Sequence, residues 1–175
     1  MLYYNTRRGL GNETTIPAAE QHMNTCGNHE RCIGKALRQA DKICRANGLR
    51  LTELRRRVLE LVWEDHAPTK AYGILDRLRA GGIPAKPPTV YRALDFLLDQ
   101  GLIHRLNSHS AYIGCLHPLR HSECYFLICS RCSEVKECCN PQLASAVTRT
   151  VGRNRFRPRR TTLEIEGECR KCKKH

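Results

Sequence analysis

Two pairs of cysteines, each with two residues between its members, place the strongest constraint on the fold of this chain. They are Cys129 with Cys132 and Cys169 with Cys172, and 36 residues separate the pairs. A CxxC turn directs two thiolates at one ion, and two such turns supply the four ligands of a tetrahedral zinc site. Two redox pairs, or chance, are the alternatives. The spacing favours a structural zinc that joins the middle of a domain to its C-terminal end, with no open position for chemistry.

The charge of the chain favours a polyanionic partner. The 175 residues have room for one or two domains and carry a formal net charge of +13. Such a surplus is typical of proteins that bind nucleic acid, although a membrane surface or simple solubility would also be compatible with it. Charge alone therefore suggests a partner without identifying it.

The chain has eleven cysteines, and their expected role depends on the compartment in which the protein resides. The first thirty residues contain no apolar stretch typical of a signal peptide, and no apolar run approaches the length of a membrane span. We therefore expect a cytoplasmic protein with no membrane partner, in which thiols stay reduced and clustered cysteines bind metal. Cys26 and Cys32, on either side of His29, fit no strong metal-binding template, and we expect them to be incidental.

Residues 1–30 show no hydrophobic period and predict a flexible arm, whereas residues 31–115 predict a winged-helix domain. Apolar residues recur at helical spacing in four segments, and two short extended runs follow at 102–106 and 111–115. Helices followed by a β-hairpin are typical of DNA-binding winged helices, and an unrelated small helical domain is the alternative. The expected boundaries are Ile33 and Asn47 for the first helix, Thr52 and Thr69 as caps of the next two, and Pro88 and Gly101 for the last.

Residues 116–175 predict a second domain with an α/β pattern, so that the whole chain is of the α+β class. Strands at 125–128 and 134–137 flank the first CxxC turn, a helix begins at Pro141, and a third strand covers 162–166. So small a sheet has an exposed edge and little core. We therefore expect this domain to pair with a second copy and to form a homodimer.

Thr89, Tyr91 and Arg92 are the candidate DNA-binding residues, because they fall on the exposed side of the last helix near its N-terminus. In helix–turn–helix docking this end of the recognition helix meets the base edges. Arginine can pair with guanine, and tyrosine can stack on a base or bind a phosphate.

A second group of candidate ligands surrounds the predicted domain boundary. His104 lies on the first wing strand and Cys115 ends the second, His117 and His121 follow, and Glu137 leaves the strand after the first CxxC turn. Two imidazoles, a thiolate and a carboxylate would form a four-coordinate mixed site. Such a site would span the hinge between the domains, where a sensor would place it.

The stretch Lys86–Leu97, with the sequence KPPTVYRALDFL, together with His104, Cys115 and the paired CxxC turns, resembles the ferric uptake regulator superfamily, most closely its zinc-sensing branch. The resemblance covers about residues 35–172. It implies a homodimeric, metal-dependent transcriptional repressor with an N-terminal winged helix and a C-terminal dimerisation domain. It also implies that Tyr91 and Arg92 contact bases.

The resemblance further implies two zinc ions per subunit. A structural zinc would be held by Cys129, Cys132, Cys169 and Cys172, and a regulatory zinc by His104, Cys115, His121 and Glu137. The segment between Cys115 and Cys129 departs from the family pattern in length and adds Cys124, so His117 is an alternative to His121. Cys138 and Cys139 have no assigned role.

The expected function is a zinc-loaded homodimer that binds palindromic operators and represses zinc-uptake genes. An iron- or peroxide-sensing regulator is the nearest alternative, but the Cys115 thiolate favours zinc. A zinc-ribbon RNA-binding protein would show more aromatic stacking residues on its sheet than Tyr125 and Phe126. We do not expect an enzyme, because a catalytic zinc needs a general base and Glu137 is already assigned to the metal.

Overall fold

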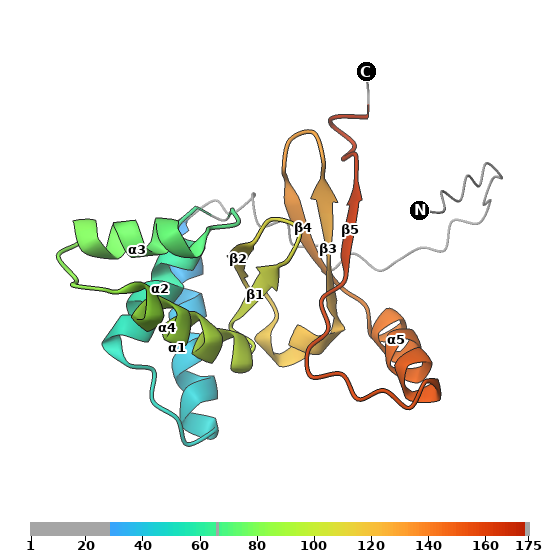
Figure 1. Cartoon of the computed structure of the whole chain (residues 1–175), viewed down its shortest axis with the longest axis horizontal. Helices are drawn as coiled ribbons and strands as arrows, with labels where there is room; N and C mark the ends of the chain where they lie inside the picture. Colours follow the sequence, from blue (N-terminus) through green and yellow to red (C-terminus); the bar gives the residue numbers. More distant parts are fainter. Residues whose placement is uncertain (1–28, 66, 174–175) are drawn as a thin grey trace.

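The computed structural model describes residues 29–65 and 67–173 (Figure 1). The arm predicted for residues 1–30 lies outside the described residues, apart from His29 and Glu30. These two residues belong to the first helix, which therefore begins four positions before the predicted start at Ile33. Cys26 also lies outside the described residues, and Cys32 is half-buried within the first helix.

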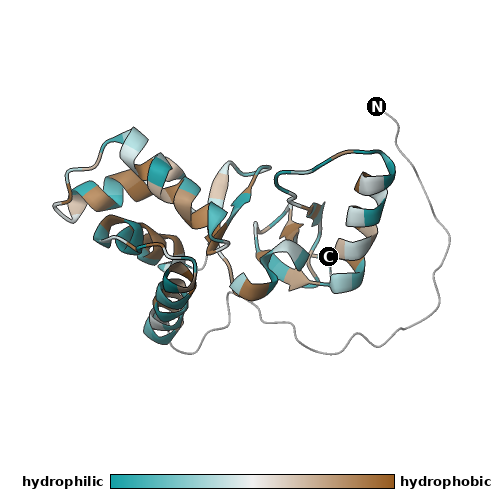
Figure 2. Cartoon of the chain, turned by 90° about the horizontal axis from the view of Figure 1, so that it is seen from below, coloured by the Kyte–Doolittle hydropathy of each residue, from teal (hydrophilic) through white to brown (hydrophobic). Residues whose placement is uncertain are grey.

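Four helices form the N-terminal half of the described chain: α1 (His29–Ala46), α2 (Glu53–Trp63), α3 (Ala71–Ala80) and α4 (Pro87–Asp99). Their apolar faces meet in one core, and Figure 2 shows the hydrophobic segments turned toward one another with the polar faces outward. The fully buried side chains of this core include Val58, Leu61, Ile74, Leu78, Leu94 and Leu97.

Two details of α3 differ from the predicted pattern. Thr69 does not cap the helix, since Lys70 is its N-cap; Thr69 is buried, and its backbone exchanges two hydrogen bonds of 2.8 Å with Tyr112. The apolar spacing also predicts that Tyr72 lies in the buried stripe with Ile74, Leu75 and Leu78. In the structure Tyr72 is 65% exposed, because the other three already cover the core side of the helix. Thr69 therefore pairs with Tyr112 of the wing and does not cap α3.

The predicted wing is present as an antiparallel hairpin of β1 (Ile103–Leu106) and β2 (Ala111–Gly114). Gly101, with φ +66°, ends α4 and turns the chain into β1. Gly114 lies against Trp63 so closely that any Cβ would overlap the indole ring, which explains the glycine at the end of β2. The hairpin therefore packs directly on α2.

The C-terminal half contains η2 (Pro118–Glu123), β3 (Cys124–Cys129), β4 (Val135–Cys139), α5 (Pro141–Arg153) and β5 (Glu164–Gly167). The strand order is β4-β3-β5, in which β3 pairs antiparallel with β4 and parallel with β5. Asn140 caps α5, since its side chain accepts hydrogen bonds from the backbone of Gln142 and Leu143. The short helix η2 was not predicted from the sequence. Within the described residues, no helix has the length and apolarity to cross a membrane.

The wing hairpin also packs on the C-terminal sheet, at what we call the wing–sheet interface. Its apolar core consists of Leu106, Ile113, Phe126, Ile128 and Val135. These residues come from both sides of the predicted domain boundary.

Glu164 on β5 adds polar contacts to the wing–sheet interface. Its carboxylate accepts hydrogen bonds from the backbone N–H groups of Asn107 (2.7 Å) and Ser108 (3.1 Å), and from the Ser108 hydroxyl. Burial raises the pKa of Glu164, but the Ser108 and Asn107 donors outweigh it, so the pKa lies below its ordinary value. The turn of the wing is thus held by an ionised carboxylate of the sheet.

Candidate metal centres and DNA-recognition helix

The four cysteines of the two CxxC turns converge at one end of the sheet. Cys129 ends β3, and the parallel pairing of Cys129 with Gly167 on β5 brings the second turn beside the first. All four sulfur atoms lie within 4.8 Å of one another. This is the arrangement that a tetrahedral ion requires, so the predicted pairing of the turns is matched by the geometry.

Backbone donors prepare this cluster for a cation. The backbone N–H of Cys169 donates to the Cys129 sulfur at 3.3 Å. This hydrogen bond has the largest effect on the Cys129 thiol and the Cys132 N–H the next largest, and together they lower the pKa of Cys129 to about 6. The neighbouring thiols of Cys169 and Cys132 in turn raise the pKa of Cys172 to about 12. One thiolate is therefore available at neutral pH, and an ion would have to displace the remaining protons.

A second cluster lies at the wing–sheet interface and joins His104 on β1, Cys115 after β2, His121 on η2 and Glu137 on β4. The ligand atoms of His104, Cys115 and His121 lie within 4.8 Å of one another. The Glu137 Oε1 atom lies 3.3 Å from His104 Nε2 and 3.6 Å from Cys115 Sγ. The structure therefore brings together the four residues predicted for the mixed site, whereas among the described residues His117 joins no such cluster.

The charge states in this second cluster follow from its burial. Burial, and then His104, lowers the pKa of His121 to about 4, so its imidazole is neutral at pH 7. Burial and then Glu137 raise the pKa of the Cys115 thiol far above its ordinary value. Burial also raises the pKa of Glu137, but His104 outweighs it and the pKa falls below its ordinary value. The site thus offers a carboxylate and a free imidazole lone pair to a cation.

Unsatisfied nitrogen atoms show that the mixed site fits a metal ion. The rings of His104 and His121 stack at 4.0 Å with an interplanar angle of 4°. Among the described residues, His121 Nδ1 and His104 Nε2 are buried without a hydrogen-bond partner, since the contact of His104 with Glu137 lacks hydrogen-bond geometry. Buried polar atoms normally have partners. A divalent cation would satisfy both imidazoles and the carboxylate.

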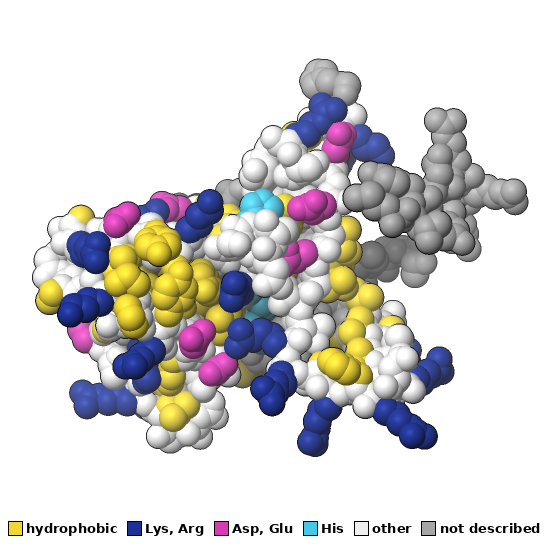
Figure 3. Space-filling model, viewed as in Figure 1, with side chains coloured by type: hydrophobic (Ala, Val, Ile, Leu, Met, Phe, Trp, Pro, Cys, Tyr) yellow, Lys and Arg dark blue, Asp and Glu magenta, His cyan; other side chains and the backbone are white. Residues whose placement is uncertain are grey.

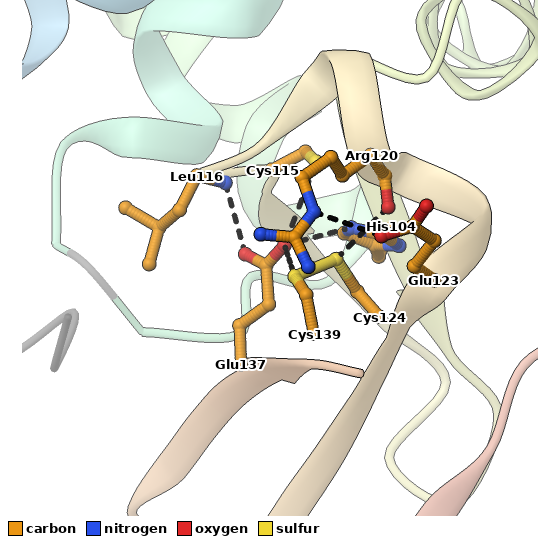
Figure 4. The surroundings of a disulfide bond; sticks show 8 residues. All are labelled: His104, Cys115, Leu116, Arg120, Glu123, Cys124, Glu137 and Cys139. Atoms are coloured by element: carbon orange, nitrogen blue, oxygen red, sulfur yellow. Dashed lines mark hydrogen bonds and ion pairs between the residues drawn. A yellow bond between two sulfur atoms is a disulfide. The ribbon is translucent and has the colours of Figure 1, made fainter. Parts of the chain in front are cut away.

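A disulfide between Cys124 and Cys139, which the sequence did not predict, lies beside this cluster. Figure 4 shows the two sulfurs next to Glu137 and His104, with the Glu137 carboxylate also accepting the Leu116 N–H at 2.9 Å. The expectation that all clustered cysteines stay reduced is wrong for this pair. The disulfide depends on the antiparallel register of β3 and β4, which places Cys124 directly opposite Cys139.

Thr89, Tyr91 and Arg92 are exposed in the first two turns of α4, while Val90 and Leu94 of the same helix are buried. Tyr91 is 41% exposed despite its apolar ring. Figure 3 shows Lys and Arg side chains projecting from both halves of the molecule, which agrees with the net charge of +13. The N-terminal end of α4 is therefore exposed to solvent, as the docking of a recognition helix on DNA would require.

A winged helix joined through a His/Cys/Glu cluster to a small sheet with four convergent cysteines defines a class of metal-linked DNA-binding regulators. The chain belongs to the Ferric uptake regulator family, whose profile matches residues 46–166.

The relatives within that family include zinc regulators. The chain is 40% identical, over 138 residues, to the Zinc uptake regulation protein of Escherichia coli K12, covering 78% of this chain and 80% of that protein. A structure of a zinc uptake regulator complexed with zinc and DNA superposes with a TM-score of 0.72 at 38% identity, covering 80% of this chain and 94% of that one. The structure of holo XcZur superposes with a TM-score of 0.71 at 39% identity, covering 79% and 97%.

Proposed function

We propose that this protein is a zinc-responsive transcriptional repressor, which binds operator DNA as a zinc-loaded homodimer and represses genes for zinc uptake. The observation that carries the proposal is the cluster of His104, Cys115, His121 and Glu137 at the wing–sheet interface. A ligand set drawn from both halves of the chain makes the position of the winged helix depend on an ion. The similarity to zinc uptake regulators over about four-fifths of the chain supports the same function.

The chemistry of the donors favours zinc over iron at the mixed site. Cys115 supplies a sulfur ligand, His104 and His121 supply nitrogen, and Glu137 supplies oxygen, which is a four-ligand set that zinc accepts in tetrahedral geometry. Iron- and manganese-sensing sites depend more on nitrogen and oxygen donors. The four-sulfur cluster would hold a second zinc, giving two resident ions per subunit.

The chain's own residues explain how ligand binding would reach the DNA. His104, Cys115, His121 and Glu137 would hold the zinc, which would act as a Lewis acid shared by donors from both halves of the chain. His104 would then be tied to Glu137 by coordination and not only by a 3.3 Å contact. Because β1 follows α4 directly, a fixed His104 fixes the recognition helix, with Thr89, Tyr91 and Arg92, relative to the sheet. Without this tie the helix samples more orientations and binds an operator less tightly.

The C-terminal half supports a dimer. Within the described residues β5 pairs only with β3, so its outer edge has no strand partner, and Ile165 on it is 45% exposed. The amphipathic helix α5 has no fully buried residue. The open edge of β5 and the apolar face of α5 would both be covered if the C-terminal sheets of two copies packed together. Such a dimer would present two recognition helices to the two halves of a palindrome. We propose residues 31–115 as the DNA-binding unit and 116–175 as the dimerisation unit.

Metal-dependent binding to DNA tests the proposal. The purified protein is titrated into a labelled duplex from the promoter of a zinc-uptake gene, in buffers that clamp free zinc over several orders of magnitude, and anisotropy is recorded. Affinity should rise with free zinc, fall on addition of a chelator, and respond less to iron(II) or manganese(II). Equal affinity with and without chelator would refute a zinc-responsive repressor. A stronger response to iron(II) would favour the iron-sensing alternative.

A further inference from the structure

Cys124 and Cys139 are placed to act as metal ligands as well as disulfide partners. Cys124 is the first residue of β3 and Cys139 the last of β4, and the two are directly opposite in the antiparallel register. Glu137, two residues before Cys139, directs its Oε1 atom to within 4.0 Å of the Cys139 sulfur. The donor atoms of the three residues all lie within 4.8 Å of one another. Figure 4 shows both sulfurs on the same side of the Glu137 carboxylate.

This group differs from the four-sulfur cluster in being incomplete. Two thiolates and one carboxylate supply three ligands, which leaves a fourth coordination position open to exchange. A zinc ion with three protein ligands keeps its fourth position for water or another exogenous ligand, through which the ion can be transferred. The donor set, with two soft sulfurs, selects zinc or another thiophilic cation over magnesium or calcium.

Cys124 is also accessible from a cavity that reaches the mixed site. Cys124 is half-buried and lines a cavity of about 410 Å³, bounded by the end of α4, η2, α5 and the segment before β5. His121, a member of the mixed site, lines the same cavity. Glu137 in turn contacts both Cys139 and His104. An ion held by the thiol pair would therefore lie next to the ligands of the mixed site.

We propose that reduced Cys124 and Cys139 form, with Glu137, a third and exchangeable zinc site beside the mixed site, and that the disulfide is the metal-free state of this pair. The proposal rests on the proposed function only through Glu137, which the two sites share as a bridging carboxylate. The zinc content per subunit then depends on the redox state of the protein. It changes by one ion between the dithiol and the disulfide.

The redox step balances with a low-molecular-weight disulfide as oxidant. One thiolate attacks a sulfur of that disulfide and forms a mixed disulfide, releasing the first small thiolate. The second cysteine thiolate attacks the mixed disulfide, forms the Cys124–Cys139 bond and releases the second. The protein loses two electrons, the oxidant gains them, and two protons from solution complete two small thiols. Any zinc that the pair held is released as Zn²⁺.

Zinc stoichiometry in both redox states tests the proposal. The full chain is loaded with excess zinc, desalted, and analysed by native mass spectrometry after reduction with a phosphine or after oxidation with glutathione disulfide. Peptide mapping verifies that Cys124–Cys139 is the bond formed. The reduced wild type should carry one more zinc per subunit than the oxidised protein. Cys124→Ser and Cys139→Ser should each carry one fewer than the reduced wild type, in both conditions.

Cys138→Ser is the matched control, because Cys138 is the neighbouring residue on β4 and is also half-buried. It should keep the redox-dependent ion. Equal zinc content in the reduced and oxidised wild type, or in the reduced wild type and Cys124→Ser, would overturn the proposal. A redox-dependent ion in a protein whose DNA binding ignores zinc would refute the proposed function but not the third site.

Discussion

Replacing His104 by alanine should separate DNA binding from zinc while leaving the fold in place. His104 is the ligand that the wing strand β1 supplies to the mixed site, whereas Glu137 belongs to the sheet and His121 to the preceding helix η2. Without the imidazole, β1 supplies no ligand to the ion, and the ion no longer links β1 to the sheet. The variant should still dimerise and retain the zinc of the four-sulfur cluster, because that cluster lies at the other end of β3.

Two effects of this substitution can be given magnitudes. Loss of the coupling between zinc and DNA, typically about 1–3 kcal/mol, should lower operator affinity by about 5–150-fold at saturating zinc. Loss of packing is separate. The His104 ring stacks on the His121 ring with 4.0 Å between their centroids, and its centroid lies 4.8 Å from that of Phe126 in an edge-to-face contact. Aromatic contacts of this kind contribute about 0.5–1.5 kcal/mol each. That cost is a fraction of the roughly 5–15 kcal/mol that stabilises a domain, so the variant should remain folded.

A matched control separates these two effects. Ile113 lies directly opposite His104 in the β1–β2 register and is fully buried, but it offers no ligand. Ile113→Val should cost about 0.5–1.5 kcal/mol of stability and keep the zinc response. Both variants are measured by operator anisotropy across buffered free zinc, with thermal denaturation recorded in parallel.

A specific result would refute the reasoning. If His104→Ala keeps the zinc response of the wild type, the regulatory ion does not bridge the wing and the sheet. The cluster of Cys124, Glu137 and Cys139 would then be the remaining candidate among the described residues. If Ile113→Val loses the response as completely as His104→Ala, packing of the wing, and not coordination, controls DNA binding.

Three further predictions concern other parts of the molecule. Cys169→Ser should lose one zinc per subunit and should no longer dimerise, because the binding energy of a structural zinc contributes directly to folding. Native mass spectrometry measures the zinc content and the oligomeric state, and a dimeric variant with its full zinc content would contradict the prediction. Arg92→Ala should cost about 1–3 kcal/mol per half-site on the operator and less on random DNA, measured by competition; equal losses would make Arg92 a phosphate contact. Glu164→Gln should destabilise the wing–sheet interface by about 1–2 kcal/mol at pH 7. Since the folded-state pKa of Glu164 is lowered, its contribution is present above the unfolded pKa of about 4.3 and is lost as pH falls through the folded value. Chemical denaturation should therefore show wild type and Glu164→Gln converging at acidic pH, and a constant difference down to pH 2 would contradict the carboxylate's role.

Local features of the chain were predictable because short-range spacing determines them. Helical periodicity, glycines such as Gly101 and the two CxxC turns act within a few residues, so the helices, the wing and the four-sulfur cluster follow from the sequence. The candidate ligands His104, Cys115, His121 and Glu137 were also named from it, partly through the resemblance to a known family. The sequence favours His121 as a ligand, with His117 as the alternative.

Long-range packing decided the rest. Only the folded chain brings His121 rather than His117 beside His104, because η2 and its contact with the wing carry no periodic signal in the sequence. Thr69 looked like a helix cap but pairs with Tyr112, since a backbone partner supplied by the wing outweighs a local preference. The Cys124–Cys139 pair depends on the register of two strands, and the hold of Glu164 on the wing turn depends on the parallel pairing of β5. These contacts join residues far apart in the chain, so their energies appear only once the tertiary structure has formed.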